Sequence, residues 1–124
     1  MGLTAEQLAA AAVPDPDRVL AALATCADWL DAAPAASVLD GLAAAADPAG
    51  GLYALRRLLD EAAPPLSSPE VSALLHLLGG SPALAAALAA EGGGWPVALR
   101  GVLTEERRDA AAHRRALELS LIHI

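Results

Sequence analysis

The chain has 124 residues, which fits one domain with a modest hydrophobic core. Its formal net charge of −7 argues against a nucleic-acid-binding domain, which needs a basic face, and against binding to an anionic membrane surface. The single cysteine, Cys26, excludes an internal disulfide and a cysteine-based zinc site.

Two helices are predicted before Pro34. Thr4 and Gln7 form a capping-box pattern, which predicts a helix from Thr4 to about Val13. Asp15 precedes a proline at a first helical position and predicts a second helix to about Ala32. Apolar residues follow a helical period along this second helix: Leu20, Leu23, Ala27 and Leu30, with Val19, Cys26 and Trp29 beside them.

Two more helices are predicted before the prolines at 64 and 65. Ser37 with Asp40 is expected to cap the third helix, and Asp47 with Pro48 begins the fourth. Their apolar faces are Val38, Leu39 and Leu42 in the third helix and Leu52, Leu55 and Leu59 in the fourth.

Residues 68–91 predict two short helices joined by a tight break. Ser68 and Ser81 each precede a proline and are expected to cap the two helices. Gly79 and Gly80 are expected to end the first helix in a left-handed conformation. The apolar residues are Val71, Leu74, Leu75 and Leu78 in the first helix and Leu84 and Leu88 in the second.

The last predicted helix is highly charged. Residues 92–94 are three glycines and predict a loop, after which residues 95–103 form a short apolar patch. Thr104 is expected to cap a helix that has Glu105 and Glu106 in its first turn and arginines after them. Because the chain shows no strand-like alternation before its last six residues, we predict an all-α fold, an irregular bundle of about six or seven short helices.

The hydrophobic stretch at residues 71–90 does not predict a membrane span. It carries no charged residue, but the Gly-Gly-Ser-Pro break at residues 79–82 favours two short helices. A signal peptide is also not predicted, since Glu6 precedes the first arginine, Arg18. We therefore expect a cytoplasmic protein with neither membrane nor nucleic-acid partners.

The sequence predicts no catalytic, cofactor-binding or metal-binding residue. Asp15 and Asp17 have the spacing of a two-metal motif, but they flank a proline at a helix start, where capping is the expected role. His76 has no acid or second histidine at metal-binding spacing, and the glycines at 92–94 lack the Gly-Lys-Ser/Thr of a phosphate loop. We expect Cys26 to be a buried hydrophobe and both tryptophans, Trp29 and Trp95, to anchor packing.

The last six residues, LSLIHI, differ in composition from the rest of the chain. They contain both isoleucines of the chain, Ile122 and Ile124, directly after a charged helix. One hypothesis is that residues 119–124 are a translated sequencing-library adapter, because the transposase mosaic end encodes this hexapeptide in one frame. The alternative is a genuine apolar C-terminus. We draw no function from His123.

Two stretches of the chain carry a resemblance to a known family. Residues 74–96 read LLHLLGGSPALAAALAAEGGGWP, and residues 46–62 read ADPAGGLYALRRLLDEA. In order and spacing they are similar to the N-terminal region of glutamine-synthetase adenylyltransferase/adenylyl-removing enzymes. That region has a D-P-x-x-x-L-x-x-L-x-x-L-L helix, then a leucine-rich helix, an L-G-x-S-P-x-L motif and a tryptophan. Residues 90–92, Ala-Glu-Gly, depart from the family's usual His-Pro-Glu-like segment.

The resemblance implies that residues 1–118 are the N-terminal helical segment of a larger nucleotidyltransferase. That family moves AMP from ATP to a tyrosine of glutamine synthetase, removes it by phosphorolysis, uses Mg²⁺ and responds to glutamine and a PII-type signal protein. Its catalytic Gly-Ser and Asp-x-Asp motif has no counterpart here and would lie beyond Glu118, so no site residue is carried over and no cofactor is expected in these residues.

The alternative is a stand-alone α-helical scaffold or protein-interaction module without catalytic activity. Apolar helix faces distinguish the two hypotheses. A segment of a larger domain should leave faces such as Leu52, Leu55 and Leu59, or Leu84 and Leu88, exposed to solvent. A complete module should bury them and unfold cooperatively.

Overall fold

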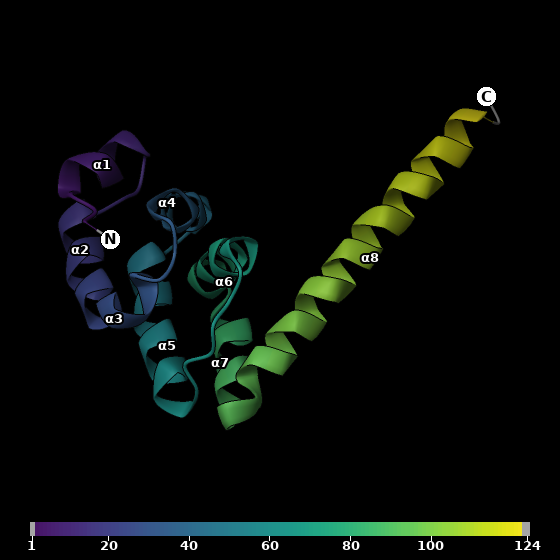
Figure 1. The fold of residues 1–124 in the computed structure, drawn as a ribbon. Helices are drawn as coiled ribbons and strands as arrows, with labels where there is room; N and C mark the ends of the chain where they lie inside the picture. Colours follow the sequence, from purple (N-terminus) through teal and green to yellow (C-terminus); the bar gives the residue numbers. More distant parts are fainter. Residues whose placement is uncertain (1, 123–124) are drawn as a thin grey trace.

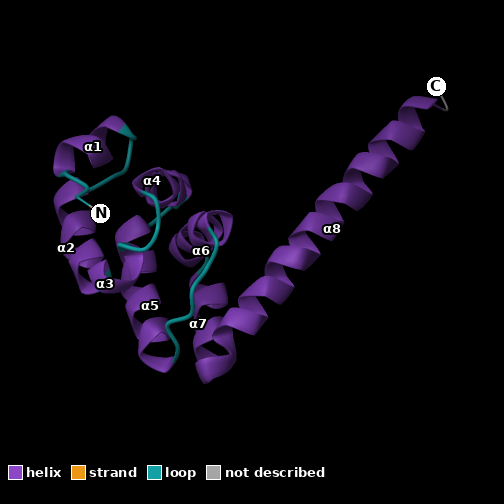
Figure 2. Cartoon of the chain, in the orientation of Figure 1, coloured by secondary structure: helices purple, strands orange, loops and turns teal. Residues whose placement is uncertain are grey.

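The computed structural model describes the backbone of residues 2–122 and the side chains of residues 2–106, 108–109, 111–112 and 114–115. In this part of the chain all regular structure is helical, which confirms the predicted all-α fold (Figure 2). The elements are α1 (Ala5–Ala10), α2 (Pro16–Thr25), α3 (Ala27–Leu30), α4 (Ala35–Ala44), α5 (Pro48–Glu61), α6 (Ser68–Gly80), α7 (Pro82–Ala90), the 3₁₀ turn η1 (Gly92–Gly94) and α8 (Trp95–Ile122).

Three of the predicted helix caps are confirmed. Before α1, the Thr4 Oγ1 accepts from the Gln7 N–H at 3.2 Å, and the Gln7 Oε1 accepts from the Thr4 N–H at 2.9 Å. The Asp47 carboxylate accepts from the Gly50 N–H at 3.1 Å, and the Ser81 hydroxyl accepts from the Leu84 N–H at 3.1 Å. Each cap satisfies a first-turn N–H that has no partner within its own helix.

The other predicted caps differ from the structure, although the predicted start of α2 after Asp15 is confirmed. Asp15 lies at the N-cap of α2 but has a left-handed backbone, with φ of 48°, and its side chain makes no cap hydrogen bond. α4 begins at Ala35 after Pro34, so Ser37 is inside the helix and caps nothing. α6 is capped by Ser67 rather than Ser68, because Glu70 stands three residues after Ser67 and completes a capping box.

The second predicted helix is divided in two. Its backbone leaves the helical conformation at Cys26, with φ of −117° and ψ of 9°, between α2 and α3. The Thr25 hydroxyl donates to the Ala22 carbonyl at 2.6 Å, which occupies one of the last carbonyls of α2. This break brings Cys26 and Leu30 into the core, while Leu20 and Ala27 are only half-buried.

Helix α6 is the centre of the body, which we define as residues 4–94. It packs against α4 and α5, and α5 in turn packs against α2 (Figure 1). On α5 the buried face contains Leu58 in place of the predicted Leu59, which is half-buried. The core residues are Leu8, Val13, Val19, Ala22, Leu23, Cys26, Leu30, Val38, Leu42, Ala49, Leu52, Leu55, Leu58, Val71, Leu74, Leu75, Leu78, Leu88, Trp95 and Leu99.

Glycines allow the central helices to approach closely. A Cβ atom at Gly51 of α5 would lie 2.6 Å from the Gly79 backbone nitrogen, and one at Gly79 would lie 2.6 Å from the Ala45 Cβ. The predicted role of Gly79 as a left-handed helix end was wrong, since α6 continues through Gly80 and then ends at the extended residue Ser81. Gly79 is needed for packing instead.

The chain turns sharply between α6 and α7. Their axes are bent by 114° at this break, which agrees with the prediction of two short helices. Among the described residues, no individual helix combines the length and the apolar composition needed to cross a membrane; α6 and α7 reach these values only when the bent pair is counted together. The predicted loop at residues 92–94 is the 3₁₀ turn η1.

Helix α8 is continuous where the sequence predicted a new helix at Thr104. It begins at Trp95 and extends away from the body to Ile122 (Figure 1). We call residues 95–103 the root, since Trp95 and Leu99 are fully buried and Leu103 is half-buried. We call residues 104–122 the arm, where every described side chain is exposed. Of the suspected adapter tail, residues 123–124 lie outside the described residues.

Candidate functional site

The titratable residues that the sequence offered as candidates for chemistry, Asp15, Asp17 and His76, do not form a site. Asp15 and Asp17 are exposed at the start of α2, and His76 is exposed on α6. Among the side chains that the structure describes, no three His, Cys, Asp or Glu residues lie close enough to hold a metal ion.

Cys26 is buried, as the sequence predicted. Its Sγ lies 3.5 Å from the Leu52 carbonyl, to which it donates, and 3.6 Å from the Thr25 hydroxyl. Burial raises the pKa of the Cys26 thiol, with smaller opposing effects from the Thr25 hydrogen bond and the Arg56 charge. A raised pKa keeps the sulfur protonated and unreactive at neutral pH, so this side chain serves packing.

The best-defined polar structure is the junction where α8 joins the body. Trp95 lies at its centre and has no solvent exposure. Its indole Nε1 donates to two carbonyls at the end of α5, those of Leu58 at 2.9 Å and Ala62 at 3.1 Å. A buried tryptophan N–H needs an acceptor, and carbonyls at the end of a helix need donors. The Leu58 carbonyl also accepts from the Ala62 N–H at 3.1 Å, so the Trp95 N–H mainly serves the Ala62 carbonyl.

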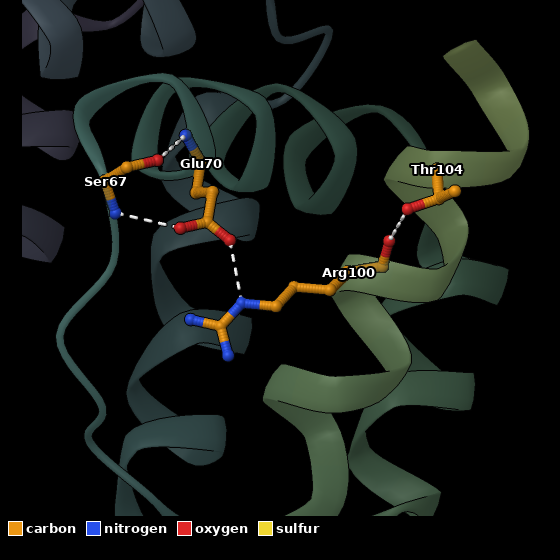
Figure 3. A network of polar contacts seen from close by, with 4 residues as sticks. All are labelled: Ser67, Glu70, Arg100 and Thr104. Carbon is orange, nitrogen blue, oxygen red and sulfur yellow. Dashed lines mark hydrogen bonds and ion pairs between the residues drawn. The ribbon is translucent and has the colours of Figure 1, made fainter.

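A second contact joins the root of α8 to α6. The Ser67 hydroxyl accepts from the Glu70 N–H at 3.3 Å, and a Glu70 carboxylate oxygen accepts from the Ser67 N–H at 2.9 Å (Figure 3). The other Glu70 oxygen accepts from the Arg100 Nε at 2.9 Å. One carboxylate therefore caps α6 and holds α8 at the same time.

These contacts stabilise the charged form of Glu70. The Ser67 N–H has the largest effect in lowering the pKa of the Glu70 carboxyl, followed by the hydrogen bond from Arg100. Only 20% of the Glu70 side-chain surface is exposed, whereas 51% of the Arg100 side chain is exposed. The pair is an orienting contact at the protein surface, where ion pairs contribute little to stability on their own.

A groove of about 300 Å³ lies between α5 and α7. Gly51, Gly79 and several alanines of α7 line it, with Asp47 and Arg57 as its charged residues. The Asp47 carboxylate is already used, because it caps α5 and lies 3.7 Å from Arg18. The groove therefore follows from small residues at a close helix crossing and offers no free catalytic group.

Only the local contacts of the junction could be predicted from the sequence. Ser67 and Glu70 form a capping box within S-S-P-E, whereas the prediction named only Ser68 as the cap. Arg100 follows Glu70 by 30 residues, and no local pattern connects the two. Trp95 was correctly predicted as a packing anchor, but its acceptors were not.

Comparison with known proteins gives no relative. No protein-family model, curated protein or solved structure matches the chain.

Proposed function

We propose that residues 1–118 are a supporting helical segment of a larger enzyme, a glutamine-synthetase adenylyltransferase/adenylyl-removing enzyme of the cytoplasm. In this proposal the body contributes no chemistry. It holds the root of α8 by Trp95 and Glu70 and so sets the direction in which α8 leaves toward the first catalytic domain.

One observation carries the proposal. The two stretches that resemble this family, residues 46–62 and 74–96, are separate in sequence but form one packed unit. α5 packs against both α6 and α7, and Trp95 donates to the carbonyls of Leu58 and Ala62. Contact between the two stretches in the fold supports the resemblance, because two stretches that matched by chance would not need to pack against each other.

The chemistry of the proposed parent enzyme belongs to residues beyond Glu118. The resemblance alone implies this chemistry: AMP transfer from ATP to a tyrosine of glutamine synthetase, phosphorolytic removal of that AMP, the use of Mg²⁺, and the response to glutamine and a PII-type protein. We place no catalytic residue, ATP or metal ion within residues 1–118.

Reading the source DNA past the codon for Glu118 tests this proposal first. We expect an open frame that replaces LSLIHI and continues into a strand bearing Gly-Ser and Asp-x-Asp. The extended protein should transfer labelled AMP from ATP to glutamine synthetase. Native sequence that runs through LSLIHI to a stop codon would refute the proposal.

The extended enzyme would also test the supporting role. Trp95→Phe keeps an aromatic ring but removes the N–H that Leu58 and Ala62 accept. We expect the variant to hold the root of α8 less firmly against the body, so that a protease cleaves α8 faster than in the native enzyme. The rate of AMP transfer should fall by a smaller factor than the one by which cleavage is accelerated. Trp29→Phe is the matched control, since the Trp29 Nε1 donates to the Pro64 carbonyl at 2.9 Å, between α5 and α6, and not to a carbonyl at the α8 junction.

A stand-alone scaffold or interaction module is the second candidate, and one observation favours it. Leu52, Leu55 and Leu88 are buried within the body, and Leu59 and Leu84 are half-buried. The body thus covers the apolar faces that a cut segment was expected to expose. Cooperative urea unfolding of a monomer, together with a native stop codon, would support this candidate over the enzyme segment.

A further inference from the structure

Helix α8 contains a helix-ending sequence and a helix-starting sequence directly after one another. Gly101 and Val102 lie near the end of the root, and Thr104, Glu105 and Glu106 begin the arm. In the structure all of these residues are helical. We propose that α8 is a two-state element that opens at residues 101–104 into two separately capped helices, and that this hinge lets the arm change direction relative to the body.

The position of the hinge follows from the contacts of the root. Arg100 bonds Glu70, Leu99 is fully buried, and Leu103 is the last half-buried side chain. Beyond Leu103 the backbone of the arm extends away from the body (Figure 1), and every arm side chain that the structure describes is exposed. The fully buried and hydrogen-bonded residues of the root thus end at Arg100, and only the half-buried Val102 and Leu103 follow before the arm. We therefore place the change in direction at residues 101–104.

The first half of the hinge sequence, Gly101 and Val102, can form a complete C-terminal cap for the root. Glycine is the usual residue just past a helix end, because it adopts the left-handed conformation without strain. In such a cap the residue after the glycine packs against the residue four positions before the glycine. These two residues are Val102 and Val97. Val97 is 74% exposed in the continuous helix and would gain an apolar partner on opening.

The end of the hinge sequence, Thr104 with the two residues after it, can form a complete N-terminal cap for the arm. A threonine at the N-cap accepts a hydrogen bond from a first-turn N–H, and acidic residues in the first turn interact favourably with the positive end of the helix dipole. Thr104, Glu105 and Glu106 supply these groups. In the continuous helix the Thr104 hydroxyl instead donates to the Arg100 carbonyl at 2.8 Å, a contact typical of bent helices. The Thr104 hydroxyl therefore has a hydrogen-bond partner both in the continuous helix and in the proposed open state.

Amide hydrogen exchange of the full chain, measured by NMR, tests the hinge. We expect a local minimum in protection at residues 103–105, with higher protection on both sides, at residues 98–101 and 108–112. Those three N–H groups lose their partners on opening, while both flanking helices persist. A protection profile that falls steadily from Leu99 to the end of α8 would show fraying from the C-terminus and overturn the proposal.

Two variants test whether the minimum in amide protection arises from the caps at Gly101 and Thr104. Gly101→Ala should raise protection at residues 103–105 about fivefold, because alanine favours the helix and disfavours the left-handed cap. No atom lies within 4 Å of the Cβ position at Gly101, so the closed helix accepts alanine without strain. Thr104→Val should raise protection by a similar factor, since it keeps the shape and removes the cap oxygen.

Thr104→Ser is the control, because it keeps the hydroxyl and should preserve the minimum. Equal protection in the valine and serine variants would contradict a role for the Thr104 oxygen in the open state. An unchanged minimum in Gly101→Ala would contradict the proposed left-handed cap. Each outcome concerns α8 alone and does not depend on the identity of the parent enzyme.

Discussion

The body and the arm are both helical, but they are stabilised by different interactions. Body helices have between 4 and 14 residues and would be marginal in isolation, so they depend on the core that they share. The described side chains of the arm are all exposed, and apart from Thr104 they are charged residues and alanines. Burial therefore determines the body, whereas local propensity and capping determine the arm. Substitutions matched between the two regions test this difference.

The largest expected effect is at Trp95, where the root enters the body. Trp95→Ala should lower the free energy of unfolding by about 3–5 kcal/mol, since it leaves a large cavity and removes the donor for two carbonyls of α5. Urea unfolding measures this loss. The half-buried Trp29 provides the comparison, and a smaller loss for Trp95→Ala than for Trp29→Ala would contradict the central position of Trp95.

The next effect separates two adjacent glycines of α6. Gly79→Ala should lower the free energy of unfolding by about 1–3 kcal/mol, because its Cβ would lie 2.6 Å from the Ala45 Cβ in a packed crossing. Gly80→Ala is the matched control. Its Cβ would meet no atom within 4 Å, so we expect a gain of about 0.4–1 kcal/mol. Thermal unfolding of both variants would show shifts in opposite directions.

A third comparison uses pH to test the Glu70 contacts. Because the folded-state pKa of Glu70 is lowered, the unfolded chain takes up its proton first as the pH falls. The stability that Glu70 contributes is therefore present above its usual pKa of 4.5 and is lost as the pH falls through the lower folded pKa. Glu70→Gln should unfold at a lower urea concentration than the native chain at pH 7, and this difference should shrink below pH 4.5.

The control for this pH effect is Glu91→Gln, at an exposed glutamate between α7 and η1. Its difference from the native chain should be small at both pH values. A difference for Glu70→Gln that grows as the pH falls would mean that the carboxylate is not stabilised by Ser67 and Arg100.

The smallest effect on the body should come from the arm. Ala21→Gly, at an exposed position within α2, should lower the free energy of unfolding of the body by about 1 kcal/mol through helix propensity. Ala112→Gly changes the same residue type in the arm and should leave the unfolding of the body within about 0.5 kcal/mol of the native chain. It should reduce only the helix content measured by circular dichroism. Equal losses in the two variants would show that arm and body unfold as one unit.

The fold class and most helix positions could be predicted because capping and apolar spacing are local. The caps at Thr4, Asp47 and Ser81 needed only a few neighbouring residues. The errors arose where tertiary contacts compete with local preference. Gly79 reads as a helix end but serves a close crossing, and Leu58 rather than Leu59 faces the core because α5 packs against several helices at once.

The junction could be predicted only in part for the same reason. The Ser67–Glu70 capping box is local, but Arg100 and the acceptors of Trp95 come from distant parts of the chain. At Thr104 the sequence predicted a helix start and the structure shows a continuous helix. The continuous helix forms there because the backbone hydrogen bonds of α8 bridge two adjacent cap sequences.

The hydrogen bonds of Trp95 also determine when the body can be completed during protein synthesis. The Leu58 and Ala62 carbonyls precede Trp95 by 37 and 33 residues. At a translation rate of about 5–20 residues per second, the end of α5 is made roughly 2–7 seconds before its donor. Until then water has to solvate the Ala62 carbonyl. A nascent chain therefore closes its core only after α6 and α7 have been made and the root of α8 has emerged from the ribosome.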